Sequence, residues 1–139
     1  MELDNINWRD WMSTKVVIIG GVAGGASAAA KARRDDENAE VVMFEKGPYA
    51  SFANCGLPYY VGGTIEDRGQ LFQVSHSRFE RWFNIDLRVS HEVTKINREN
   101  KEVEVINHET GEEFNESYDK LIVATGGEPF RPPIPGIDS

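Results

Sequence analysis

The feature that most constrains the fold is a glycine cluster that joins a β-branched run to an alanine-rich segment. The run is KVVII at residues 15–19, the cluster is GGVAGG at residues 20–25, and the alanine-rich segment covers residues 26–34. This order is typical of a strand, a tight turn and a helix. A polar turn at residues 35–39 then leads to a second apolar run, EVVMF at residues 40–44. The segments predict a βαβ unit with two parallel strands and a right-handed crossover.

Two shorter helices are expected after this unit. Pro58 suits the first turn of a short helix, where its missing N–H has no partner to lose. Residues 74–83 suit a second helix, with one aromatic face formed by Phe79, Trp82 and Phe83.

The hydrophobic period then changes to two. Three alternating segments separated by turn-rich sequence predict an antiparallel meander: residues 89–96, 102–107 and 113–118. Residues 120–124, KLIVA, return to the pattern of a fully buried strand. The expected fold class is α/β, a Rossmann-like βαβ sheet combined with an antiparallel β-meander.

Composition excludes several classes of partner. The 139 residues carry 15 Lys and Arg against 23 Asp and Glu, a net charge of -8, which repels nucleic acid and anionic lipid. No apolar run approaches the roughly 18 residues that a membrane span needs. We therefore expect a cytoplasmic protein that binds neither nucleic acid nor membrane.

The glycine cluster and Glu45 together fit a nucleotide site. In dinucleotide-binding folds, the N–H groups of such a turn and the positive end of its helix face a pyrophosphate. The strict G-x-G-x-x-G pattern is not met, because Val22 stands at the middle glycine. A plain strand-to-helix turn is thus an alternative.

Glu45 follows Gly25 by 20 residues, at the strand end where an acidic side chain accepts both hydroxyls of an adenosine ribose. This spacing does not distinguish FAD from NAD.

Cys55 is the single cysteine of the chain, so an internal disulfide and a Cys-rich zinc site are excluded. A lone cysteine is most often an inert core residue. Its neighbours Ser51, Asn54 and Gly56 are polar or small, and a helix starting beside Gly56 would direct its positive end at the sulfur, favouring the thiolate. No second thiol is present. A reactive Cys55 would therefore form a mixed disulfide with a small thiol, or a sulfenic acid.

The remaining candidates are expected to be structural. His76, His91 and His108 lack the spacing of a metal site, and we expect them at the surface and no metal. Arg33 and Arg34 suit the end of a helix, where positive charge complements the helix dipole.

Three segments resemble the amino-terminal part of coenzyme A-disulfide reductases, single-cysteine members of the pyridine nucleotide-disulfide oxidoreductase superfamily. They are KVVIIGGVAGGASAAAKARR, VVMFEKGPYASFANCGLPYYVGG and YDKLIVATGGEPFRPPIPG, of which SFANCGLPYY is the most specific part. Persulfide reductases and NADH oxidases are closely related members of the same superfamily. The likeness covers residues 15–139, and the polar residues 1–14 before it are expected to be an N-terminal extension. The resemblance implies the first segment of an FAD-binding domain at residues 15–130. Residues 131–139 would be a linker toward an NAD(P)H-binding domain outside this chain.

The resemblance also implies roles for individual residues. It places along or around FAD the residues Gly20, Gly21, Val22, Ala23, Gly25, Glu45, Lys46, Val93, Ala124, Thr125 and Gly126. The first five would follow the pyrophosphate, Glu45 and Lys46 would lie at the adenosine, and Val93 would contact the adenine through its main chain. The redox thiol would be Cys55, and the substrate contacts would be Arg34, Ser51, Phe52 and Asn54.

The implied activity is that of an FAD-dependent reductase with NAD(P)H as co-substrate. It would act on coenzyme A disulfide or a related persulfide through Cys55, as a homodimer when full length. Ala23 stands where related NADH peroxidases and many water-forming NADH oxidases have a histidine, which favours a disulfide or persulfide over oxygen. Two alternatives stay open: an NADH oxidase that uses a cysteine sulfenate, and a flavin-binding module that is not catalytic as this isolated chain.

Overall fold

The structure is a computed structural model that describes residues 13–74, 76–127 and 130–137. The expected extension at residues 1–14 therefore lies almost wholly outside the described residues. Among the described residues, no helix has both the length and the apolar character needed to cross a membrane.

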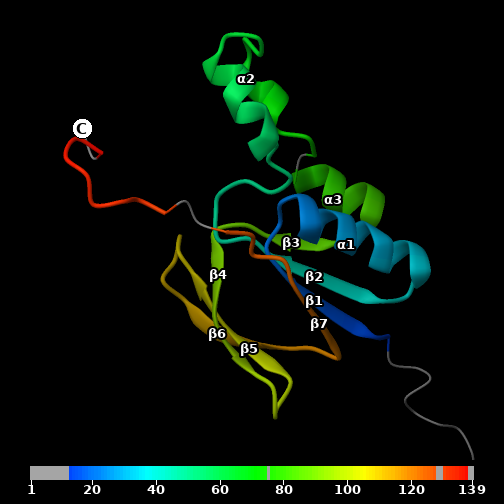
Figure 1. Cartoon of the computed structure of the whole chain (residues 1–139). Coiled ribbons are helices and arrows are strands. Elements are labelled where there is room, and N and C mark those ends of the chain that lie inside the picture. Colours follow the sequence, from blue (N-terminus) through cyan, green and yellow to red (C-terminus); the bar gives the residue numbers. More distant parts are fainter. Residues whose placement is uncertain (1–12, 75, 128–129, 138–139) are drawn as a thin grey trace, which may run out of the picture.

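A parallel sheet of four strands forms the centre of the fold (Figure 1). Its strand order is β3-β2-β1-β7, with β1 at Lys15–Ile19, β2 at Glu40–Phe44, β3 at Asp86–Arg88 and β7 at Lys120–Val123. The crossover between β1 and β2 is made by helix α1, Ala23–Asp35. The expected βαβ unit is confirmed, and so is the α/β fold class.

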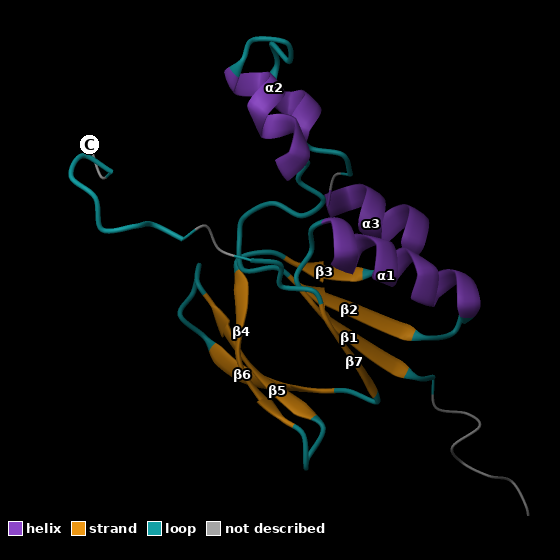
Figure 2. Ribbon diagram, in the orientation of Figure 1, coloured by secondary structure: helices purple, strands orange, loops and turns teal. Residues whose placement is uncertain are grey.

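Both faces of this sheet are covered, as a parallel sheet requires. Helices α1 and α3, the latter at His76–Phe83, lie on one face, and the antiparallel meander lies on the other (Figure 2). Successive side chains of β1 point to opposite faces of the sheet, so they belong to two separate hydrophobic clusters. Val16 and Ile18 pack with the helix side, whereas Val17 and Ile19 pack with the meander side.

The meander consists of three strands in the order β4-β5-β6. They are β4 at His91–Asn97, β5 at Glu102–Asn107 and β6 at Glu113–Ser117. Val103 and Val105 of β5 are buried against the parallel sheet. The register of β4 and β5 shifts between Val93 and Lys95, as in a β-bulge.

The segment between β2 and α3 contains short helical turns and projects away from the sheet (Figure 1). It contains the 3₁₀ turn η2 at Asn54–Gly56, helix α2 at Leu57–Val61 and the 3₁₀ turn η3 at Arg68–Leu71. Proline lies in the first turn of α2, as expected.

The structure differs from the sequence predictions at four places. Helix α1 begins at Ala23 and not at residue 26, so part of the glycine cluster is helical. Strand β3 was not predicted, because three residues are too few to establish a period. Strand β7 is at the sheet edge and not fully buried, with Val123 57% exposed. Trp82 does not share the buried face of Phe79, because it is 67% exposed and stacks with Arg78 at 4.3 Å.

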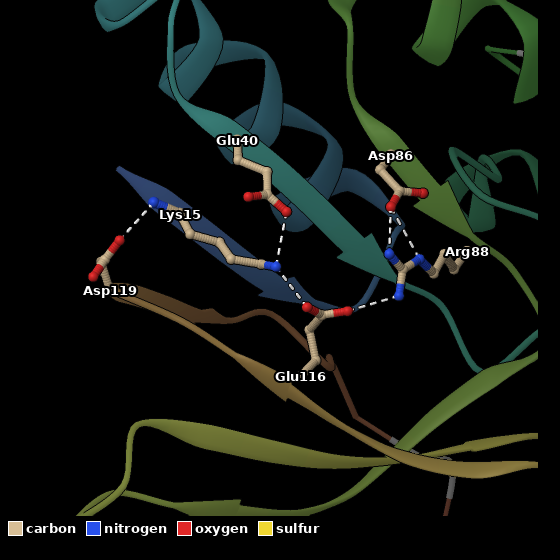
Figure 3. A network of polar contacts seen from close by, with 6 residues as sticks. All are labelled: Lys15, Glu40, Asp86, Arg88, Glu116 and Asp119. Carbon is tan, nitrogen blue, oxygen red and sulfur yellow. Dashed lines mark hydrogen bonds and ion pairs between the residues drawn. The ribbon is translucent and has the colours of Figure 1, made fainter. Parts of the chain in front are cut away.

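A polar network joins the meander to the parallel sheet (Figure 3). Glu116 of β6 pairs with the ammonium of Lys15 at 2.6 Å and with the guanidinium of Arg88 at 2.7 Å. Lys15 also pairs with Glu40, and Arg88 with Asp86. One carboxylate thus connects β6 to the strands β1 and β3.

Candidate functional site

The glycine cluster makes two backbone approaches that a side chain would prevent. Gly20 has φ 98°, and a Cβ built there would lie 2.4 Å from the carbonyl oxygen of Ala124. A Cβ on Gly25 would lie 1.7 Å from the carbonyl oxygen of Gly20. These approaches hold the start of α1 directly against the ends of β1 and β7. Val22 is the N-cap residue of α1 and contributes no side-chain cap.

Glu45 follows β2 and turns its carboxylate back to the glycine turn. Oε2 accepts the N–H of Gly21 at 2.7 Å, and Oε1 accepts the N–H of Gly47 at 2.8 Å. A carboxylate has about four lone-pair positions, so both oxygens keep acceptor capacity. Glu45 therefore orders two turns and can still accept hydroxyl groups.

A pocket of about 240 Å³ opens at the carboxyl ends of β1 and β2. Five of the residues assigned to FAD by resemblance lie around it, and these are Gly20, Glu45, Lys46, Val93 and Thr125. The other lining residues are Ile19, Phe44, His91 and Glu92. In open α/β sheets, ligands bind outside the carboxyl ends of the strands. The pocket has the position of such a site.

Two charged residues of the pocket lining, Lys46 and Glu92, form an ion pair, and His108 contacts Glu92 from outside the lining. The ammonium of Lys46 lies 2.8 Å from Oε1 of Glu92, and Nε2 of His108 lies 2.8 Å from Oε2 of the same carboxylate. The hydrogen bond from Lys46, with a further one from His108, lowers the pKa of Glu92. Glu92 is therefore held as a carboxylate between two basic side chains.

The cysteine-containing loop is anchored to the glycine turn. The N–H of Ser51 donates to the carbonyl of Gly21 at 2.7 Å, and the N–H of Gln73 donates to the carbonyl of Ser51 at 3.1 Å. Phe52 forms a β-bridge with Phe72, and their rings lie 5.5 Å apart. These contacts bring Ser51 and Phe52 beside the start of α1.

Cys55 lies in the turn η2 and is exposed. Asn54, which precedes it, is exposed as well. Gly56, which follows it, is buried, and a Cβ there would lie 2.6 Å from Cδ2 of Leu71. The close packing of Gly56 fixes the backbone, while the thiol remains open to solvent. Cys55 is therefore not a core residue.

Arg34 is not brought to the pocket. It lies in the last turn of α1, eleven residues beyond Ala23, and at 1.5 Å per residue this is about 16 Å along the helix. Its neighbour Arg33 is structural, because its guanidinium donates to the carbonyls of Phe83, Glu37 and Asn84.

The closing segment after β7 lies beside the glycine turn. The N–H of Ala124 donates to the carbonyl of Ile19 at 2.8 Å. Thr125 lines the pocket, and Gly126 has φ 70°, a conformation that favours glycine. The three residues thus follow one another along the edge where β1 and β7 end.

Two residues that line the pocket were not assigned to the nucleotide site from the sequence. Both Glu92 and His91 line the pocket, and His91 is half-buried, with its ring 6.2 Å from that of Phe44. The surface location expected for His91 is therefore wrong. Their position in the sequence could have indicated them, because both residues lie at the start of a strand, directly before Val93.

Comparison with known proteins defines the class to which this fold and pocket belong. The family described as pyridine nucleotide-disulphide oxidoreductase matches residues 14–139. The chain belongs to this family. Within it, the chain is similar to coenzyme A disulfide reductases. That of Staphylococcus epidermidis strain RP62A is 44% identical over 117 residues, which cover 84% of this chain and 27% of the relative.

Solved structures show the same likeness. The reduced Bacillus anthracis CoADR-RHD is 52% identical with a TM-score of 0.87, covering 92% of this chain and 23% of that one. An NAD-dependent persulfide reductase from A. fulgidus is 40% identical with a TM-score of 0.85, covering 90% and 23%. The water-forming NADH oxidase from Lactobacillus brevis is 33% identical with a TM-score of 0.84, covering 91% and 28%. The chain thus spans about a quarter of the length of its relatives.

Proposed function

We propose that this chain forms the FAD-binding part of an NAD(P)H-dependent flavoprotein reductase that acts on coenzyme A disulfide or a related persulfide through Cys55. One observation carries the proposal. The pocket at the carboxyl ends of β1 and β2 gathers Gly20, Glu45, Lys46, Val93 and Thr125 from four separate segments. The similarity to coenzyme A disulfide reductases supports the substrate class.

The described residues fit the adenosine diphosphate part of FAD. Gly20 and Gly25 leave the turn without side chains where backbone must be approached closely. The first turn of α1, which includes Ala23, supplies backbone N–H groups and the positive end of a helix of 13 residues. Glu45 retains acceptor positions for ribose hydroxyls, and Val93 lines the same pocket through β4. FAD, when bound, supplies a two-electron relay from NAD(P)H to the disulfide.

Cys55 would carry the sulfur chemistry. Its thiolate attacks one sulfur of coenzyme A disulfide, so the disulfide bond breaks, a mixed disulfide of Cys55 and coenzyme A forms, and one coenzyme A thiolate leaves. Two electrons, which originate from NAD(P)H, then cleave the mixed disulfide to two thiolates, and these take protons from solvent. Exposure of Cys55 supports this role, because a partner disulfide must reach the sulfur.

The substrate contacts would extend along α1. Ser51, Phe52 and Asn54 flank the thiol in sequence and lie in the loop anchored to Gly21. Arg34, at the far end of α1, could meet a phosphate only of a long substrate that runs beside this helix. Coenzyme A has this elongated character, and the Arg34 side chain forms no hydrogen bond or ion pair among the described residues.

Further parts of the proposal rest on the sequence and on the resemblance. They are a homodimer of the complete protein, a cytoplasmic location, an FAD-binding first segment over residues 15–130 and a linker at residues 131–139. Ala23, in place of a histidine, supports disulfide or persulfide reduction over oxygen reduction. In the complete protein, the rates of NADH oxidation with coenzyme A disulfide, with a persulfide and with oxygen alone distinguish these acceptors.

Equilibrium titration tests the flavin site. FAD added to the 139-residue chain should bind with one-to-one stoichiometry, and ADP should compete with it because the pocket holds the adenosine half. Absence of saturable FAD binding by the folded chain would contradict the proposal.

Mass measurement of the intact chain tests the thiol. After mixing with coenzyme A disulfide, the chain should gain the mass of one coenzyme A joined by a disulfide, and dithiothreitol should reverse the gain. Cys55→Ser should gain nothing. An unmodified wild-type chain under the same conditions would remove Cys55 from the reaction.

A further inference from the structure

Glu92 forms an ion pair with Lys46, whose ammonium is the only one among the side chains that line the described pocket. The ionisable lining side chains besides His91 are Glu45, Glu92 and Lys46. Both oxygens of Glu45 already accept backbone N–H groups of neighbouring turns. The ammonium of Lys46, in contrast, pairs with Glu92 at 2.8 Å. The carboxylate of Glu92 therefore reduces the attraction of the Lys46 ammonium for an additional anion.

The backbone fixes Glu92 and Lys46 beside each other. The N–H of His91 donates to the carbonyl of Glu45 at 3.0 Å, and the next residue on each segment is one member of the pair. On its other side, Glu92 contacts His108, whose N–H donates to the carbonyl of Ser90 at 2.8 Å. Glu92 is thus held between Lys46, just after the end of β2, and His108, in the turn after β5. Its side chain is nevertheless 30% exposed.

We propose that Glu92 is a specificity-determining residue of this pocket: by pairing with Lys46, it selects an adenosine with free ribose hydroxyls against one that carries a ribose phosphate. The inference rests on the proposed function, because it assumes that the pocket takes an adenosine. Among the side chains that line the pocket, the two carboxylates of Glu45 and Glu92 outnumber the one ammonium of Lys46, so a ribose phosphate meets repulsion. Loss of the Glu92 charge would reduce this repulsion, and it would remove one carboxylate that competes with the phosphate for the Lys46 ammonium.

The test compares two probes on the 139-residue chain, ADP and ADP that carries a 2′-phosphate, by isothermal titration calorimetry. Glu92→Gln should shift the ratio of the two affinities toward the phosphorylated probe by about twofold to fivefold, within the range of one exposed charge pair. The shift should decrease as salt is raised, because Lys46 is 68% exposed.

Two further variants isolate the effect. Glu104→Gln removes the carboxylate of a comparable exposed pair, in which Glu104 lies 2.7 Å from Lys95, outside the pocket, and should leave the ratio unchanged. Lys46→Gln in the Glu92→Gln background should abolish the gain. Circular dichroism of each variant confirms that the fold is kept.

The possible outcomes separate the two proposals. If the wild-type chain binds ADP but Glu92→Gln leaves the ratio unchanged, or shifts it no more than Glu104→Gln does, Glu92 does not determine specificity. If the folded wild-type chain binds neither ADP nor FAD, the proposed function fails, and this inference fails with it.

Discussion

At the scale of single residues, Glu45 illustrates how one side chain can serve both the fold and a ligand. Its carboxylate accepts the N–H groups of Gly21 and Gly47. We predict that Glu45→Ala lowers the free energy of unfolding by about 1–3 kcal/mol, because two backbone donors lose their acceptor. FAD affinity should fall as well. Urea denaturation followed by circular dichroism, and FAD titration of the folded variant, measure the two effects separately.

The carboxylate at the other end of the same strand provides a control for Glu45. Glu40 begins β2 and pairs with Lys15 at 2.8 Å, with 51% of its side chain exposed. Glu40→Ala should leave FAD affinity unchanged. Equal losses of affinity in the two variants would assign the Glu45 effect to general destabilisation and not to a ligand contact.

At the scale of elements, the approach of α1 to β1 depends on one helical glycine. A Cβ on Gly25 would lie 1.7 Å from the carbonyl oxygen of Gly20, so Gly25→Ala must push the helix away from the sheet. We predict a loss of about 1–3 kcal/mol in the free energy of unfolding, the usual cost of overpacking. Thermal and urea denaturation measure it.

The neighbouring glycine of the same helix is the matched control. A Cβ on Gly24 would meet Cβ of Ala124 at 3.5 Å, an ordinary contact. Since alanine forms helix better than glycine, Gly24→Ala should be neutral or stabilising by up to about 1 kcal/mol. If both substitutions destabilise equally, the close approach of Gly25 is not the cause.

The elements that were predictable from sequence are those with a strong local pattern. The β-branched run of β1, the glycine turn and the spacing to Glu45 predict the βαβ unit, and alternation predicts the meander. Strand β3 was missed because Asp86–Arg88 is short, and its pairing with β2 is long-range. The exposed edge of β7 was missed because composition does not reveal which strands lie at a sheet edge.

The candidate site shows the same division. Gly20, Glu45 and Thr125 could be named from motif and resemblance, and the fold places them around one pocket. The pairing of Lys46 with Glu92 could not be named, because it requires the tertiary contact between the end of β2 and the start of β4. Local sequence carries no signal for such a pair.

At the scale of the whole molecule, Glu116 connects the two sheets. Its side chain is 12% exposed and contacts both Lys15 and Arg88 (Figure 3). Burial lowers the pKa of Lys15, but the contacts with Glu116 and Glu40 outweigh it and raise that pKa above its ordinary value. The resulting stabilisation is present below the pKa of the unfolded chain and is lost as pH rises through the higher pKa of the folded chain. We therefore predict that stability declines in strongly alkaline solution.

A substitution of Glu116 tests whether its contacts with Lys15 and Arg88 cause this alkaline decline in stability. Glu116→Gln should lower the free energy of unfolding by about 1–3 kcal/mol at neutral pH, since two cations lose a charged partner. It should also weaken the alkaline decline. Glu104→Gln, on the neighbouring strand and 43% exposed, should cost at most about 1 kcal/mol. Urea denaturation at several pH values compares them, and an unaltered alkaline slope in Glu116→Gln would contradict the assignment.

The last prediction concerns turnover by the 139 residues taken alone. Hydride transfer requires a nicotinamide in near contact with the flavin, and a displacement of about 1 Å can cost a hundredfold in rate. The described residues contain one glycine-rich nucleotide turn, at residues 20–25, and one turn does not hold two dinucleotides. We expect the chain to take up FAD and to form the Cys55 mixed disulfide once, without continuous NADH oxidation in the presence of coenzyme A disulfide. Absorbance at the NADH maximum follows the reaction. Steady NADH consumption that requires FAD and is abolished by Cys55→Ser would show that these residues form a complete catalyst.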